Sequence, residues 1–112
     1  KISAYFYLYT MANTSTPENL REWIPCDDME TCIYQVSDIL QNCGYRIMYT
    51  EVFSSSEFMV NQWVLDDGMA FLRSFQDERL LFELSSFNHD KYVKMATNLK
   101  ELTIFRKGNT FR

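Results

Sequence analysis

The sequence predicts an α+β protein, a two-layer sandwich in which two helices cover one face of a largely antiparallel sheet. Segments 27–43 and 88–102 repeat apolar residues at intervals of three and four, which is typical of amphipathic helices. Between them lie four segments that are rich in β-branched and aromatic residues and separated by turn residues: 45–53, 58–65, 69–75 and 80–87. This order predicts a meander of antiparallel strands between the two helices.

Length and composition predict one soluble domain, 1–112. Apolar residues make up 46% of the chain and charged residues 23%, which are ordinary values for a globular protein. No apolar run approaches the ~20 residues of a membrane span. The net charge of −4 argues against a nucleic-acid partner, because phosphate binding needs clustered Lys and Arg. We therefore expect neither nucleic acid nor membrane as a partner. The start at Lys1 leaves open whether a targeting segment precedes it.

Cysteine and histidine usage argues against several kinds of site. Cys26, Cys32 and Cys43 are odd in number and lack metal-ligand spacing, so we expect reduced thiols in a cytoplasmic protein. His89 is the only histidine, which disfavours a histidine-rich metal site and a Ser-His-Asp triad. The sequence has no glycine-rich phosphate loop. We expect no metal and no cofactor.

The N-terminal part is predicted to be a strand followed by a long, irregular segment. Segment Ile2–Thr10 alternates between a mostly aliphatic face and a tyrosine face. The tyrosine face is either ordinary sheet surface or a contact with a subunit or ligand. Further on, Thr16 and Pro17 are typical of the N-cap and first residue of a helix, which predicts a short helical turn through Trp23, ended by Pro25.

The helix Asp27–Cys43, stopped by Gly44, is expected to pack on the Phe6 and Leu8 face of the first strand. The strand Tyr45–Phe53 follows, and alternation predicts that five of its side chains share one face: Tyr45, Ile47, Tyr49, Glu51 and Phe53. A carboxylate among aromatic side chains must be paired, exposed or used by a ligand, because an isolated buried charge is too costly. Glu51 thus either reaches solvent or a lysine, or faces a cationic small molecule.

The C-terminal part is predicted to be a second helix and a short closing strand. Asn88 or Asp90 is expected to cap the helix. Its expected inner face consists of Tyr92, Met95, Ala96, Leu99 and Leu102. Thr103–Lys107 is expected to be the closing strand.

The run Leu65–Asp77 reads L-D-D-G-M-A-F-L-R-S-F-Q-D and is followed by the strand Leu80–Phe87. This order resembles the bacterial S-adenosylmethionine decarboxylase family, which reads roughly L-A-E-S-H-x-S-I-H-T-W-P-E and then G-Y-A-A-V-D-x-F-T-C. Cys43-Gly44 and Glu51–Ser55 fall where that family has the end of its helix and its H-x-F-S-P segment. The resemblance implies a ferredoxin-like or S-adenosylmethionine decarboxylase-like sandwich.

The departures from that family concern its chemistry. The serine that self-cleaves to form the family's pyruvoyl group falls at Gly68, and the adjacent histidine falls at Met69. The second motif histidine is Arg73, and the cysteine proton donor falls near Phe87 or Asn88. Decarboxylation of this kind cannot run without the pyruvoyl electron sink. We therefore do not expect a decarboxylase.

A scaffold of this kind without the pyruvoyl serine resembles the phage-encoded enzymes that degrade S-adenosylmethionine, the SAMases or S-adenosylmethionine lyases. The resemblance implies a bacteriophage protein of anti-restriction type that works in the host cytoplasm as a homotrimer, with sites near the subunit interfaces. In the lyase reaction, the substrate's own carboxylate attacks its γ-carbon and releases methylthioadenosine and homoserine lactone. A hydrolase stays open, as does a non-catalytic sensor or inhibitor that binds S-adenosylmethionine or a nucleotide.

This reaction asks for a carboxylate near the substrate's positive charge, aromatic side chains for the adenine and the cation, and small donors for the substrate carboxylate. Glu51 is the candidate catalytic residue. The candidate substrate-binding residues are Tyr49, Phe53, Ser54, Ser55, Trp63, Arg73 and Glu83.

Several of these candidates have a structural alternative. Trp63 is either a stacking partner or a residue of the core or an interface. The serines 54–56 are either donors or only a turn. Glu83 rivals Glu51 as the essential carboxylate, and Arg73 could simply pair with one of the two.

Overall fold

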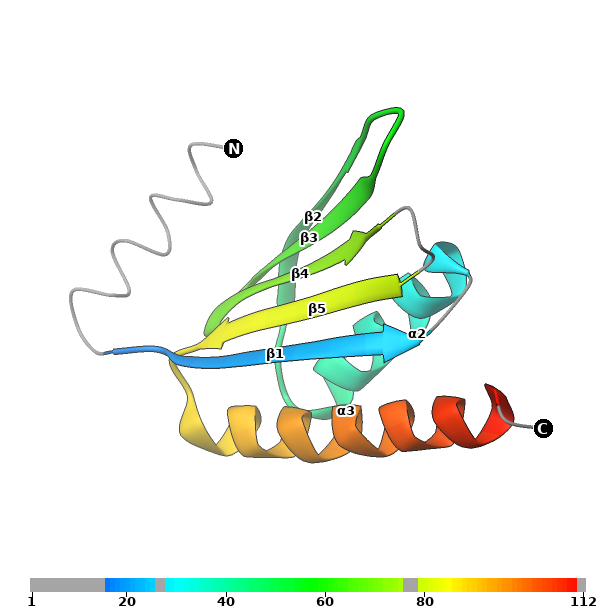
Figure 1. The fold of residues 1–112 in the computed structure, drawn as a ribbon. Helices are drawn as coiled ribbons and strands as arrows, with labels where there is room; N and C mark the ends of the chain where they lie inside the picture. Colours follow the sequence, from blue (N-terminus) through cyan, green and yellow to red (C-terminus); the bar gives the residue numbers. More distant parts are fainter. Residues whose placement is uncertain (1–15, 26–27, 76–78, 111–112) are drawn as a thin grey trace.

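A computed structural model of the chain describes residues 16–25, 28–75 and 79–110, with side chains described for 16–24, 28–75 and 79–100. These residues form a five-stranded antiparallel sheet and two helices (Figure 1). The predicted α+β two-layer sandwich is confirmed. The predicted strand Ile2–Thr10, with Phe6 and Leu8, and the predicted turn 76–78 lie outside the described residues.

The strands lie in the order β1-β5-β4-β3-β2 across the sheet. The predicted meander is confirmed as the four consecutive strands β2 to β5. In chain order the elements are β1 (Glu18–Pro25), α2 (Met29–Asn42), β2 (Ile47–Ser54), β3 (Met59–Leu65), β4 (Gly68–Ser74), β5 (Arg79–Ser86) and α3 (His89–Thr110). Helix α2 lies behind the sheet in Figure 1, and α3 runs along β1.

The hydrophobic core lies between the sheet and the two helices, on the side that we call the helix face. Helix α2 begins after the N-cap Asp28 and ends before Gly44, whose φ of 102° suits glycine. Helix α3 begins after Asn88, whose side-chain oxygen accepts the Lys91 N–H (3.0 Å). The helices contribute buried side chains at intervals of four, which are Cys32, Val36, Leu40, Met95 and Leu99.

The predicted helical turn from Thr16 to Trp23 is wrong, because residues Glu18–Pro25 form strand β1. This strand pairs with β5 along its whole length, from Glu18↔Ser86 to Pro25↔Arg79. The alternation of its side chains directs Leu20 and Ile24 into the core. A helix of so few residues is unstable in isolation. Pairing with β5 instead gives each residue of β1 a cross-strand neighbour and anchors the strand through backbone hydrogen bonds at alternate residues.

The predicted closing strand Thr103–Lys107 is also wrong, because these residues belong to α3, which continues to Thr110. Once a helix has formed, each further residue adds a backbone hydrogen bond at little additional cost. The periodic inner face predicted for the first half of α3 is confirmed by the buried Met95 and Leu99.

The prediction that five alternate residues of segment 45–53 share one face is correct only in part. The register between β2 and β3 shifts between Ile47 and Tyr49, so that Met48 is an extra residue. Tyr45 and Ile47 therefore pack against the helices. After the bulge, alternate residues starting at Tyr49 point to the opposite side of the sheet.

Candidate functional site

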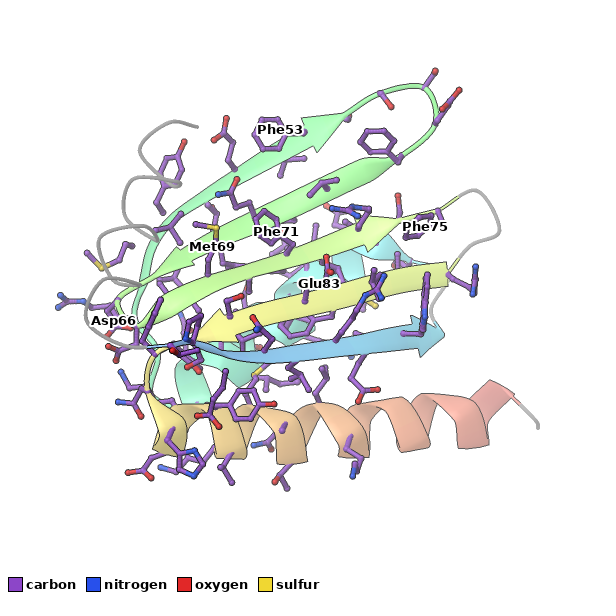
Figure 2. All side chains as sticks on the ribbon, turned by 60° about the vertical axis from the view of Figure 1, so that its left-hand side comes forward. Phe53, Asp66, Met69, Phe71, Phe75 and Glu83 are labelled. Atoms are coloured by element: carbon purple, nitrogen blue, oxygen red, sulfur yellow. The ribbon has the colours of Figure 1, made fainter. Side chains whose placement is uncertain are left out.

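The candidate site lies on the outer face, which is the side of the sheet turned away from α2 and α3. Strand register and side-chain alternation assign its residues: Asn19, Arg21 and Trp23 from β1; Tyr49, Glu51 and Phe53 from β2; Val60, Gln62 and Val64 from β3; Met69, Phe71 and Arg73 from β4; and Arg79, Leu81, Glu83 and Ser85 from β5. Figure 2 shows Phe53, Met69, Phe71 and Glu83 distributed over this face from β2 to β5.

Five of the predicted site residues therefore lie on the outer face: Tyr49, Glu51, Phe53, Arg73 and Glu83. They come from three strands, and the central strands between them carry apolar side chains. Val64 and Met69 are buried there and pack with Phe71 in a small second cluster. The outer face thus combines a small apolar cluster with polar and charged side chains, and ligand-binding sites use both kinds of group.

Glu51 lies on β2 between two exposed aromatic side chains. The hydroxyl of Tyr49 donates to Glu51 Oε1 (2.7 Å). This hydrogen bond, together with the negative charge of Glu51, raises the pKa of the Tyr49 hydroxyl. Tyr49 and Phe53 remain 42% and 40% exposed, so both rings are accessible to a ligand. A half-buried carboxylate flanked by accessible aromatic rings is suited to hold an organic cation.

Glu83 and Arg73 lie on the outer face of the adjacent inner strands β5 and β4, with Arg73 near the end of β4. Glu83 forms an ion pair with Arg21 of β1 (3.5 Å) rather than with Arg73. The register places the half-buried Arg73 between Val60 and Leu81. Glu51 and Arg73 are two strands apart, or about 10 Å across the sheet. The face therefore offers a negative and a positive group to one ligand.

Trp63 is not part of this site. It lies on the helix face, is fully buried and packs edge-on against Phe82 (6.4 Å between ring centroids). Its indole Nε1–H donates to Ser37 Oγ of α2 (2.9 Å). The structural alternative for Trp63, a core residue, is confirmed.

The two predicted serines do not join the outer-face residues either. Ser54 is paired with Met59, and alternation places it on the helix-face side of β2. Ser55 Oγ accepts the backbone N–H groups of Glu57 and Phe58 (3.2 and 3.3 Å), which stabilises the turn between β2 and β3. The turn reading is therefore confirmed for Ser55.

Sequence reasoning missed the basic and aromatic end of the outer face. The guanidinium of Arg79 lies 4.2 Å from the ring centroid of Trp23, and the Trp23 and Phe75 rings are 5.4 Å apart. Arg21 adds a second positive charge on β1. The alternation of residues 18–25 contains the signal that would have found this group, but the Thr-Pro helix start concealed it.

A second polar cluster fixes the start of α3 to the turn between β3 and β4. Lys91 Nζ contacts Asp67 and, at 3.4 Å, Asp66. Burial acts to lower the pKa of Lys91, but the two carboxylates together raise it above its ordinary value. The nearby Tyr45 hydroxyl is hydrogen-bonded to Ser86 Oγ, and burial raises its pKa to about 12. Every charge here has a partner, which indicates a structural role.

The residues at the position of the family's pyruvoyl group do not fit such a group. Gly68 has no hydroxyl from which a pyruvoyl group could form. A Cβ added at Gly68 would lie 2.1 Å from the carbonyl oxygen of Ser85, so no serine can take its place without backbone movement. The residue at this position therefore supports no pyruvoyl-dependent step.

Two further properties concern the part of the chain that the structure describes. Its histidine, cysteine, aspartate and glutamate residues include no group of three or more placed to hold a metal ion. None of its helices is both long enough and apolar enough to cross a membrane. In comparisons with known proteins, neither a family model nor a curated protein matches the chain.

Proposed function

We propose that this protein binds S-adenosylmethionine on the outer face of its sheet and cleaves it to methylthioadenosine and homoserine lactone. The observation that carries the proposal is the position of Glu51, hydrogen-bonded to Tyr49 and followed on the same face by Phe53 and, two strands away, by Arg73. S-adenosylmethionine combines a sulfonium and an ammonium with a carboxylate and an aromatic base. Each of these groups has a complement on this face.

The reaction is an intramolecular displacement. One oxygen of the substrate's α-carboxylate forms a bond to its γ-carbon, while the bond between that carbon and sulfur breaks. The electron pair of the broken bond neutralises the sulfonium, which leaves as the thioether methylthioadenosine, and the new ring is homoserine lactone. No proton has to move, so the protein needs to fold the substrate into an attacking conformation and to exclude water.

The residues of this chain take simple roles in that step. Glu51 contacts the sulfonium of the substrate, and Tyr49 orients Glu51 through the hydrogen bond of 2.7 Å. Phe53 and Phe71 offer aromatic faces for the adenine or the sulfonium. Arg73 draws the substrate's negative end toward the centre of the sheet. We place the protein in the cytoplasm, in a host cell if it is phage-encoded, because that compartment supplies the substrate.

A non-catalytic S-adenosylmethionine-binding protein is the second candidate. The exposure of Tyr49 and Phe53 favours it, because a single copy leaves water in contact with the candidate site. A sensor needs only affinity, whereas the displacement proceeds better in a dry site.

Incubation of the purified protein with S-adenosylmethionine, followed by mass analysis over time, separates these functions. We expect methylthioadenosine and homoserine lactone in equal amounts, with the lactone preceding homoserine. Homoserine that carries oxygen from labelled water in its side-chain hydroxyl would instead indicate a hydrolase, because hydrolysis of the lactone places that oxygen in the carboxylate. Intact substrate that nevertheless binds would support the sensor, and intact substrate without binding would refute both candidates.

A further inference from the structure

The two edges of the described sheet differ in how they are protected. At the β1 edge, α3 lies alongside, where Tyr92 donates its hydroxyl to the Asn19 carbonyl (3.0 Å) and His89 contacts Glu18 (2.9 Å). At the other edge lies β2, whose exposed apolar side chains include Met48 and Val52 at 53% and 54%. Proteins normally blunt such an edge with lysine, proline, a β-bulge or a covering element, because unpaired backbone groups recruit another strand. The bulge of β2 lies near its start, at Met48, and residues 49–54 keep a regular register.

The backbone of β2 presents its outward hydrogen-bonding groups at alternate residues. The hairpin is closed by the bond from Ser55 N–H to the Phe58 carbonyl (2.9 Å). Because hydrogen-bonded and non-hydrogen-bonded pairs alternate, the backbone groups of Tyr49 and Glu51 face β3, whereas those of Thr50 and Val52 face outward. A strand added to this edge must therefore bond to Thr50 and Val52.

We propose that β2 pairs antiparallel with β2 of a second copy, about a two-fold axis at Thr50. In this register the two Thr50 residues exchange backbone hydrogen bonds, and each Tyr49 lies opposite Glu51 of the other copy. The exposed Met48 of one copy lies opposite the exposed Val52 of the other. Tyrosine with carboxylate, threonine with threonine, and methionine with valine are all favourable cross-strand pairs.

Neighbouring registers are less favourable. Shifting the axis to Glu51 puts the two Glu51 carboxylates directly opposite each other, which destabilises the pairing. Shifting it to Val52 puts each Glu51 opposite the apolar ring of Phe53. The Thr50 register is the one of the three in which the carboxylate meets a hydrogen-bond donor.

This contact doubles the candidate cation site. Two Tyr49 hydroxyls and two Glu51 carboxylates lie on the joined outer face, with the Cα atoms of the two Glu51 residues diagonal to each other at about 7–8 Å. The second copy also covers side chains that a single copy exposes. The role of this cluster as the substrate's cation site rests on the proposed function, whereas the contact between copies does not. A two-fold contact closes on itself and gives a dimer rather than the trimer that the family resemblance implies.

Light scattering on the eluting protein, over a range of concentrations, tests the contact. The pairing between the two β2 strands is short, so we expect a weak dimer. Its measured mass should rise toward twice the 13.4 kDa chain mass as the concentration increases to roughly tens of micromolar. Thr50→Pro removes the outward N–H of each copy and leaves the bonds to β3 intact, as proline on an edge strand does. It should weaken dimerisation about tenfold or more. The matched control Thr50→Ala keeps the N–H and should still dimerise. A monomer at all concentrations, or a trimer, would overturn the proposal.

Cross-linking tests the register independently of the proline variant. In a background with Cys26 replaced by serine, Thr50→Cys should form a disulfide-linked dimer on mild oxidation, and Val52→Cys should do so far more slowly. The reverse order would overturn the Thr50 register and the doubled site with it. A dimer that does not cleave S-adenosylmethionine refutes the proposed function alone. Cleavage that is unchanged in a monomeric Thr50→Pro protein refutes the contact's role in the site.

Discussion

The charge of Glu51 is the property of the site on which the proposal depends most. Glu51→Gln removes that charge but keeps an oxygen that can accept the Tyr49 hydroxyl, which donates to Glu51 Oε1 at 2.7 Å. The loss is therefore the charge-assisted contact with the ligand, worth about 1.5–3 kcal/mol at a half-buried position. We expect affinity or turnover for S-adenosylmethionine to fall by roughly tenfold to 150-fold, at about 1.4 kcal/mol per factor of ten.

The assay is equilibrium binding and turnover of S-adenosylmethionine, with S-adenosylhomocysteine, which keeps the ammonium but lacks the sulfonium charge, as the comparison. The variant should lose its preference for the sulfonium ligand, while its affinity for the thioether changes little. Unfolding by urea should be within ~0.5 kcal/mol of the parent protein, as for ordinary surface changes. Glu83→Gln is the control, because Glu83 already pairs with Arg21. If Glu83→Gln abolishes turnover and Glu51→Gln preserves it, the site lies on β5 and the reasoning from β2 is wrong.

Three further predictions concern the fold. Trp63→Phe loses the bond from Nε1 to Ser37 and buried ring volume, so urea unfolding should show a loss of about 1–3 kcal/mol, with ligand affinity unchanged. Gly68→Ala should cost at least ~3 kcal/mol or prevent folding, as judged by circular dichroism, because its Cβ meets the Ser85 carbonyl at 2.1 Å. The hydrogen bond and charge of Glu18 raise the pKa of His89 above 6.5, so this contact stabilises the fold fully below about pH 6.5 and loses its effect as the pH rises through the raised value. A Glu18→Gln protein should therefore differ from the parent in urea midpoint at acidic pH and converge with it at alkaline pH; a constant difference would contradict this assignment.

Local patterns in the sequence were sufficient for most of the fold. Apolar spacing located α2 and the start of α3, and turn residues separated the strands of the meander. The failures occurred where two local signals competed. In residues 16–25 the Thr-Pro pair predicted a helix start, although polar and apolar side chains alternate there as in a strand. Pairing with β5 makes this segment a strand. At 103–107, β-branched and aromatic residues predicted a strand, but continuation of an existing helix prevailed.

The candidate site could be predicted from the sequence only as far as strand alternation holds. Alternation correctly placed Tyr49, Glu51 and Phe53 on one face, but the bulge at Met48 separated Tyr45 and Ile47 from them. Which face each strand turns to the helices is a tertiary property, and for that reason Trp63 could be read either as a ligand contact or as core. The partnership of Trp23 with Arg79 depends on the pairing of β1 with β5, which the sequence reasoning did not foresee.

The most direct test of the outer-face site is nuclear magnetic resonance of the labelled protein during titration with S-adenosylmethionine. We predict that the amide signals of Tyr49, Glu51 and Phe53 on β2 and of Phe71 on β4 shift, while the indole N–H of Trp63, which is bonded to Ser37 on the helix face, does not. Shifts centred on Trp63 and α2, or no shifts at millimolar ligand, would contradict the assignment of S-adenosylmethionine binding to the outer face.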